Sequence, residues 1–128
     1  YYEGGMRLKK HYFRLIGELK STGEEFECAA LLNSLSQVKY WVRNIERRPQ
    51  SSFWLPTSTD LFYPDFVVML QDGRYLVVEY KGEHLWSNDD SKEKRAVGEL
   101  WAARSNGQCS FVMPNGKDWG AIQRMVTK

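Results

Sequence analysis

The sequence predicts a single α/β domain in which helices cover both faces of a small mixed sheet. Its 128 residues, 42% of them hydrophobic and 14% aromatic, are enough for one compact core and too few for two. Helical and alternating apolar patterns follow one another in the order helix, three strands, helix, strand, helix. The second and third strands are apolar on both faces, so we expect helices on both sides of a four-stranded sheet.

The first third of the chain contains the first helix and the first strand. Residues 1–21 are too irregular for a regular element, and we expect a connecting segment with a short strand or a helical turn. Thr22 and Glu25 stand at capping-box spacing, and the apolar recurrence after them predicts a helix over residues 23–35. Alternating polar and apolar residues over 37–45 then predict a strand with one wetter face.

A hairpin occupies the middle of the chain. The Pro-, Ser- and Thr-containing stretch 46–61 predicts a loop before it. Two runs rich in Val, Leu, Phe and Tyr then predict antiparallel strands over residues 63–70 and 74–81. A polar stretch follows, and Asp90 and Glu93 stand again at capping spacing before an apolar helical stripe.

The last third of the chain completes the sheet. The second long helix is expected to stop before Asn106-Gly107, a good C-terminal stop signal. Residues 108–113 predict a short strand, residues 114–116 a turn, and the apolar residues of 119–126 a last helix.

Charge and cysteine content narrow the function classes. Eighteen basic against 16 acidic residues give a net charge of +2, which neither requires nor excludes a nucleic-acid partner. Cys28 and Cys109 stand far apart in apolar contexts and form no zinc spacing with His11 and His84, so we interpret both as buried free thiols. No apolar run approaches the roughly 18 residues of a membrane helix, and no signal-peptide pattern opens the chain. A cytoplasmic protein without a membrane partner is therefore expected.

Three charged residues stand at neighbouring ends of the apolar hairpin. Asp65 begins its first strand, and Glu79 and Lys81 end its second. A charge in such a strand must be paired, must bind an ion, or lowers stability. Glu79 and Lys81 are two residues apart and so share one face of their strand. The three residues indicate a candidate site.

The length of the hairpin loop decides whether Asp65 joins that face. With a two-residue loop, Asp72-Gly73, Asp65 lies opposite Tyr80 and on the other face. With a three-residue loop, Gln71–Gly73, whose last glycine is left-handed, Asp65 lies directly opposite Glu79. Only the second register brings the two carboxylates together.

Opposed carboxylates repel each other unless a cation lies between them. Asp65, Glu79 and the backbone carbonyl of Tyr80 form a hard oxygen set that suits Mg²⁺, for which Mn²⁺ can substitute. Lys81 is then placed to orient the attacking water and to balance charge on a pentacovalent phosphate. The alternative is that a Glu and a Lys two residues apart form an ordinary solvated strand face.

The motif Pro64-Asp65, thirteen residues, Glu79-Tyr80-Lys81 resembles the PD-(D/E)xK nuclease signature. Longer stretches, spread over nearly the whole chain, resemble the C-terminal nuclease-like region of type III restriction enzyme, restriction-subunit-like DEAD/DEAH-box helicases. These stretches are Lys10–Tyr12, Glu25–Ala29, Trp41–Asn44, Phe53–Pro56, Phe62–Phe66, Glu79–Gly82 and Gly98–Trp101.

The resemblance implies a restriction-endonuclease-like core and a metal-dependent DNA endonuclease, that is, a phosphodiester hydrolase. It implies that Asp65 and Glu79 are metal ligands, together with the Tyr80 carbonyl, and that Lys81 is the catalytic lysine. Glu27, on the first helix, matches the acidic residue that many such nucleases place beside the metal. Its alternative is an ordinary exposed helix carboxylate.

The resemblance also implies partners. Residues 1–128 are expected to be one nuclease-like domain excised from a larger bacterial or archaeal helicase-nuclease, which a start at Tyr1 rather than Met also suggests. The chain has no Gly-x-x-x-x-Gly-Lys-Ser/Thr motif and hence no P-loop nucleotide site. ATP-driven translocation is therefore expected of an attached helicase region, and sequence recognition of a methyltransferase subunit.

A nuclease also needs cations that contact phosphates. For each cation a plain solvated face is the alternative. The candidates are Arg43, Arg47, Arg48, Lys92, Lys94 and Arg95.

Two other functions compete with cleavage. One is a binding module that keeps the nuclease fold and clamps DNA without cutting it. The other is an interaction or dimerisation domain, suggested by the aromatic content.

Overall fold

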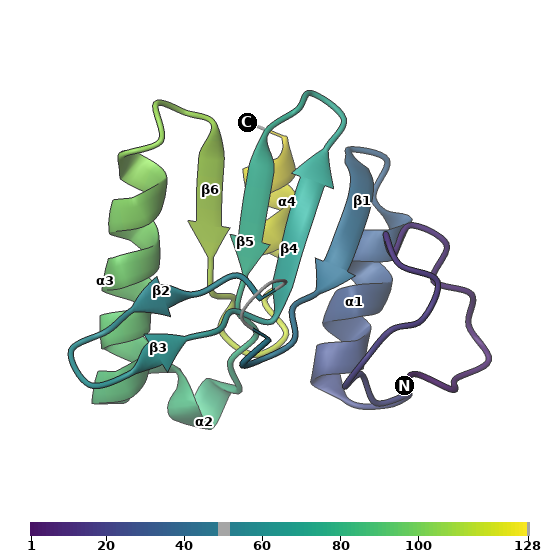
Figure 1. Ribbon diagram of the computed structural model, residues 1–128, viewed down its shortest axis with the longest axis horizontal. Coiled ribbons are helices and arrows are strands. Elements are labelled where there is room, and N and C mark those ends of the chain that lie inside the picture. Colours follow the sequence, from purple (N-terminus) through teal and green to yellow (C-terminus); the bar gives the residue numbers. More distant parts are fainter. Residues whose placement is uncertain (49–51, 128) are drawn as a thin grey trace.

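The computed structural model describes residues 1–48 and 52–127 (Figure 1). Its helices and strands follow the predicted order, with two short strands and one short helix added. The elements are α1 (Glu24–Ser34), β1 (Val38–Arg43), β2 (Leu55–Pro56), β3 (Leu61–Phe62), β4 (Phe66–Leu70), β5 (Tyr75–Val78), α2 (Glu83–Trp86), α3 (Asp89–Ala103), β6 (Cys109–Val112) and α4 (Gly120–Val126).

Four strands form a mixed sheet in the order β1-β4-β5-β6. β4 pairs antiparallel with β1 and β5, whereas β6 pairs parallel with β5. Parallel neighbours need a crossover connection, and α2 and α3 supply it. The prediction of an α/β domain with a four-stranded mixed sheet flanked by helices is confirmed at this level.

The two faces of the sheet carry two separate hydrophobic clusters. α1 and α4 cover one face, where Leu32 and Ile122 pack with Trp41 and Phe66 of the sheet. α3 covers β5 and β6 on the other face, where Val97 and Trp101 pack against Val77 and Phe111 (Figure 1). The α3 side of the sheet is covered only in part, because Val67 and Met69 of β4 remain half-buried beside the exposed Tyr40 and Tyr75.

The amino-terminal segment contributes more to the fold than a connecting segment does. Leu8, Ile16 and Leu19 are buried in the cluster beneath α1. His11 forms an isolated parallel bridge with Trp41 of β1, but residues 1–21 contain neither the short strand nor the helical turn expected there. The segment is therefore part of the hydrophobic core of the domain.

Both predicted helix caps were wrong, although both helices exist. α1 has Gly23 at its N-cap, with φ of 97°, and no side chain caps it. The chain enters α1 through this positive φ, which favours glycine, so Thr22 lies outside the helix. α3 starts before Asp90, because the side chain of Asn88 accepts a hydrogen bond from the backbone N–H of Ser91.

The predicted loop 46–61 contains the small β2–β3 sheet, whose Leu55 and Phe62 pack beside α3. Residues 49–51 of that loop lie outside the described residues.

The hairpin strands β4 and β5 are shorter than predicted. Consequently Asp65, Glu79 and Lys81 lie just beyond their ends, at the edge of the sheet where β1, β5 and β6 finish and β4 begins (Figure 1).

Candidate functional site

The hairpin loop sets the geometry of the candidate site. The N–H of Leu70 donates to the carbonyl of Arg74 at 2.8 Å, and Gly73 has φ of +90°. The strand pairs run from Met69 with Tyr75 to Phe66 with Val78. The next pair outward is Asp65 with Glu79, so the three-residue loop is confirmed and the two-residue alternative was wrong.

The structure brings Asp65 and Glu79 together at that position. The backbone N–H of Asp65 donates to Glu79 Oε1 at 3.1 Å, and the backbone N–H of Tyr80 donates to Asp65 Oδ2 at 2.8 Å. The side chains are only 18% and 8% exposed. One oxygen of each carboxylate thus accepts a hydrogen bond from a backbone N–H of the facing segment. These bonds hold both side chains in one orientation.

Burial raises the pKa of both carboxyl groups. The pKa of Glu79 is well above its usual range because the side chain is desolvated and because Asp65 is negatively charged beside it. Burial also raises the pKa of Asp65, although the Arg43 guanidinium and the Tyr80 N–H oppose the shift. An ion or proton shared by the two groups relieves this repulsion.

Lys81 completes the predicted trio. Its Nζ lies 3.7 Å from Glu79 Oε2, and its side chain is 18% exposed. Its backbone carbonyl accepts from the N–H of Gly116 at 2.9 Å, and it forms an isolated bridge with Asn115. The turn after β6 therefore holds the main chain of Lys81 in place, while its side chain stays partly exposed.

Arg43, predicted as a phosphate contact, lies inside the site. Its Nη1 is 3.8 Å from Asp65 Oδ1 and its Nε is 3.0 Å from Glu25 Oε1. The Nε and Oε1 atoms are close but not aligned for a hydrogen bond, so the contact is an ion pair only. The Arg43 side chain is 11% exposed, and these two acids engage it.

Glu25 is the site residue that sequence reasoning missed. The sequence pattern indicates only a helix cap at this position, whereas the Glu25 carboxylate faces Arg43. Burial and the charge of Asp65 raise its pKa, and Arg43 lowers it in part. No sequence signal indicated this contact, because Arg43 reaches Asp65 and Glu25 only through the pairing of β1 with β4 and the packing of α1 on β1.

Glu27 and the cysteines complete the surroundings of α1. Glu27 is exposed and pairs with Lys117 at 3.5 Å, so the structure does not bring it together with Asp65 and Glu79. Cys28 is a fully buried free thiol, as predicted, and burial together with Asp65, Glu25 and Glu79 raises its pKa well above its usual range. Cys109 is also free, but it is only partly buried, so the prediction that it is buried was wrong.

The other residues predicted to contact phosphate differ in whether a side chain of this protein already pairs with them. Arg47 pairs with Asp60 at 3.5 Å, and Lys94 pairs with Asp90 at 3.1 Å. The charge of Lys94 also lowers the pKa of Glu79, so Lys94 is close to the site. Arg95 lies 3.5 Å from the centre of the Trp86 ring and donates to the Trp86 carbonyl. Arg48 and Lys92 are exposed.

A groove of about 690 Å³ adjoins the end of β5. The hydroxyl of Tyr80 donates to Glu24 in its wall, and burial and Glu24 raise the Tyr80 pKa. None of Asp65, Glu79 and Lys81 lines this groove, which lies on the Tyr80 side of the strand end. Its lining residues are Glu24, Tyr80, Gly82, Glu83, His84, Gly116 and Lys117.

Within residues 1–48 and 52–127, no three His, Cys, Asp or Glu side chains gather closely enough to hold a metal ion. The site therefore offers two side-chain carboxylates, and any further ligand must come from the backbone, from water or from substrate. A hydrated ion such as Mg²⁺ accepts this number of protein ligands.

Comparisons with known proteins add no relative. No family model matches the chain, and neither the curated proteins nor the solved structures contain a match. In the described part of the chain, no helix has the length and apolar character that crossing a membrane requires.

Proposed function

We propose that this protein is a metal-dependent deoxyribonuclease domain, an endonuclease that hydrolyses phosphodiester bonds in DNA on a restriction-endonuclease-like core. One observation carries the proposal. The β4–β5 register sets Asp65 opposite Glu79, and Lys81 Nζ lies 3.7 Å from Glu79 Oε2. The order α1, β1, β4, β5, α3, β6 and the mixed pairing of the sheet support the same core.

The carboxylate pair fits a divalent cation. Asp65 Oδ2 and Glu79 Oε1 accept backbone hydrogen bonds, whereas Asp65 Oδ1 and Glu79 Oε2 face the cationic groups of Arg43 and Lys81. Two buried carboxylates with raised pKa values attract a compensating positive charge. Asp65, Glu79 and the Tyr80 carbonyl would hold Mg²⁺ or Mn²⁺, which when bound supplies Lewis-acid polarisation of the phosphate.

Two basic side chains of the protein would supply charge balance and orientation at the site. Lys81 is held near the pair by Glu79 but is exposed enough to reach a phosphate, where its ammonium group balances the charge that builds up in the transition state. Arg43 neutralises Asp65 and Glu25 from the α1 side and keeps the Asp65 carboxylate oriented.

The proposed setting is a larger helicase-nuclease of the type III restriction kind, in which an attached ATPase region moves DNA and a methyltransferase subunit recognises sequence. The chain has no P-loop motif, so any ATP-driven movement of DNA would belong to the attached region.

A second candidate function is a DNA clamp that does not cut. One observation favours it: each carboxylate already has a protein cation nearby, since Arg43 Nη1 is 3.8 Å from Asp65 and Lys81 Nζ is 3.7 Å from Glu79. These cations partly neutralise the two acids without a metal, and a clamp needs only the surrounding cations.

Metal titration by calorimetry distinguishes the two. We expect the unaltered chain to bind Mg²⁺ and Mn²⁺. The Asp65→Ala and Glu79→Ala variants should each bind neither metal. The matched control is Asp72→Ala, which removes an exposed carboxylate at the other end of the same hairpin and should leave binding unchanged. The unaltered chain is also titrated in the presence of a DNA duplex, whose phosphates could complete the metal site. If the chain binds no metal either alone or with the duplex, the clamp is the better explanation.

A further inference from the structure

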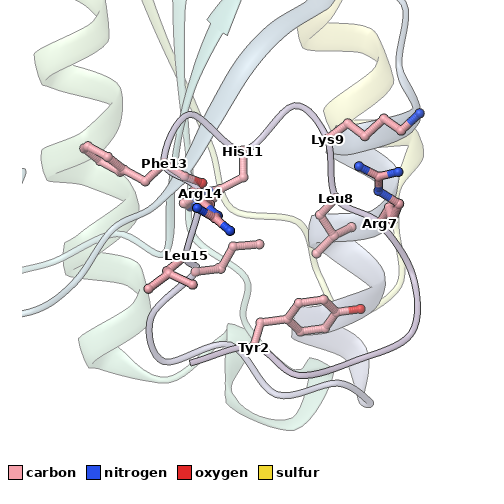
Figure 2. Close-up of a pocket in the computed structure, with 9 residues that line it drawn as sticks. Tyr2, Arg7, Leu8, Lys9, His11, Phe13, Arg14 and Leu15 are labelled. Carbon is pink, nitrogen blue, oxygen red and sulfur yellow. The ribbon is translucent and has the colours of Figure 1, made fainter.

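The amino-terminal segment encloses a hollow of about 320 Å³ away from the carboxylate pair. Figure 2 shows the segment curling around it, with Arg7 and Arg14 on opposite sides of the curl. Its lining includes three cations and no carboxylate, which makes it a hollow for an anion. The lining residues are Tyr2, Arg7, Leu8, Lys9, His11, Phe13, Arg14, Leu15 and Ile16. We call it the amino-terminal hollow.

Positive charge is concentrated around this hollow. Residues 1–21 contain five Lys or Arg and two Glu, whereas residues 22–128 contain 13 basic and 14 acidic residues. Arg7, Lys9 and Arg14 are exposed, and none of them forms an ion pair with any residue that the structure describes. Their charges are therefore available to a ligand.

The hollow is built on a fixed frame. The N–H of Tyr2 donates to the Ile16 carbonyl at 2.7 Å and closes the curl. Leu8 and Ile16 are buried beneath it, and the backbone N–H of Lys10 donates to Asn33 Oδ1 of α1 at 2.9 Å. A ligand meets cations whose backbone is already ordered, which lowers the entropy lost on binding.

His11 links the hollow to the carboxylate site. Its Nε2 accepts from the backbone N–H of Arg43 at 3.1 Å, so its Nδ1 carries the hydrogen and donates to the Phe13 carbonyl at 2.7 Å. A smaller neighbouring hollow shares His11, Phe13 and Leu15 with the first and is also lined by Arg43. A continuous series of lining residues therefore leads from Arg14 to the guanidinium beside Asp65.

We propose that the amino-terminal hollow binds a backbone phosphate of the DNA strand whose scissile phosphate lies at Asp65 and Glu79, with Arg7, Lys9 and Arg14 as its cations. This inference rests on the proposed function and adds a second contact point to it. Guanidinium groups match phosphate oxygens in geometry, and Phe13, which is 55% exposed, offers a ring face to the adjacent base or sugar. Free inorganic phosphate has the same chemistry and is the competing source of the anion.

The test measures binding separately from cutting. Fluorescence anisotropy of a labelled DNA duplex, in Ca²⁺ and on a Lys81→Ala background, is compared between Arg7→Gln/Arg14→Gln and the matched pair Arg104→Gln/Arg124→Gln. Both pairs remove two exposed arginines, but Arg104 and Arg124 do not line the hollow. Each lost phosphate contact should reduce the slope of log K against log salt by about 0.9 for duplex DNA. Because the hollow holds one phosphate, we expect a reduction of about 0.9 in the first pair and none in the second.

The outcomes separate the inference from the nuclease proposal. A shallower slope in Arg7→Gln/Arg14→Gln would support phosphate binding in the amino-terminal hollow. If the unaltered chain at the same time shows no metal-dependent cutting, the nuclease proposal is refuted. Equal slopes for the two pairs, or no binding of DNA by the parent chain, would overturn the inference. Inorganic phosphate that shifts the Arg7 and Arg14 side-chain resonances in NMR while the slopes stay equal would show a free-anion site, which also overturns it.

Discussion

The β4–β5 hairpin carries acid–base pairs at both ends, and the two ends behave oppositely. At the loop end, Arg74 Nε lies 2.7 Å from Asp72 Oδ2, and the Asp72 side chain is 53% exposed. At the other end, Asp65 and Glu79 lie face to face with Lys81 and Arg43 around them, and the two acids are largely buried. Both ends use similar residue types within one short hairpin.

The environment, not the residue type, sets the chemistry. At the loop, hydrogen bonds from the Arg74 backbone and side chain lower the pKa of Asp72. At the sheet edge, burial outweighs the cations and raises the pKa of both carboxyl groups. A charge pair in water needs no further partner, whereas a buried pair of acids retains an affinity for a cation.

The largest expected effect is on cleavage. Lys81→Ala should lower the rate of DNA cutting in Mg²⁺ by at least about 10² to 10³, because it removes the ammonium group nearest the reacting phosphate. Arg74→Ala removes a cation of the loop end and should leave the rate within about twofold. Plasmid nicking followed on gels measures both rates, and thermal unfolding checks that both variants fold. Normal cutting by Lys81→Ala would remove Lys81 from the mechanism.

The second effect is on stability in the absence of metal. Glu79→Gln keeps the acceptor for the Asp65 N–H but removes a buried negative charge beside Asp65. Desolvation and the charge of Asp65 raise the pKa of Glu79 more than the charge of Lys81 lowers it. The Lys81 side chain is itself partly exposed to water. We therefore expect Glu79→Gln to raise the free energy of unfolding by about 1–2 kcal/mol at pH 8 in EDTA.

Urea unfolding measures this change, and Asp72→Asn is the control. At the loop end the ionised acid is the favoured form, so that variant should be slightly less stable than the unaltered chain. A loss of stability in Glu79→Gln would show that its ion pair with Lys81 dominates the buried end.

The third effect concerns the loop that aligns the two ends. Gly73 has φ of +90°, and no atom lies within 4 Å of the Cβ that a substitution would add, so strain and not collision determines the cost. Gly73→Ala should lower the free energy of unfolding by about 1 kcal/mol. Gly5→Ala, where φ is not in the left-handed region and space is also free, should be neutral. Equal urea midpoints for the two variants would argue against a strained position.

The register of the hairpin was predictable because it depends on local chemistry. A glycine at the third loop position permits the left-handed residue that this loop needs, and the count of residues back along both strands then places Asp65 opposite Glu79. The helix caps were not predictable in the same way. Asn88, Asp89 and Asp90 are all suitable cap residues, and residue type alone does not select Asn88 among them.

The buried neighbours of the site were harder to predict. Glu25 and Arg43 meet only because α1 packs on β1 and β1 pairs with β4, which are contacts between segments far apart in the sequence. The amino-terminal segment gave no periodic pattern, since Leu8, Ile16 and Leu19 are buried by an irregular backbone. Hydrophobic periodicity reports only regular elements.

The smallest effect is the response of the loop end to acid. The pKa of Asp72 is lowered in the folded chain from an ordinary value of 3.8, so its ionised form favours folding. That contribution is fully present above the ordinary value and is lost as the pH falls through the lowered folded value. The gap in unfolding free energy between the unaltered chain and Asp72→Asn should therefore be constant from about pH 6 down to about pH 5 and shrink at lower pH, as followed by urea unfolding. A gap that widened on acidification would mean that Asp72 gains a proton more readily in the folded chain, as burial makes Asp65 and Glu79 do, and the two ends of the hairpin would then follow one rule.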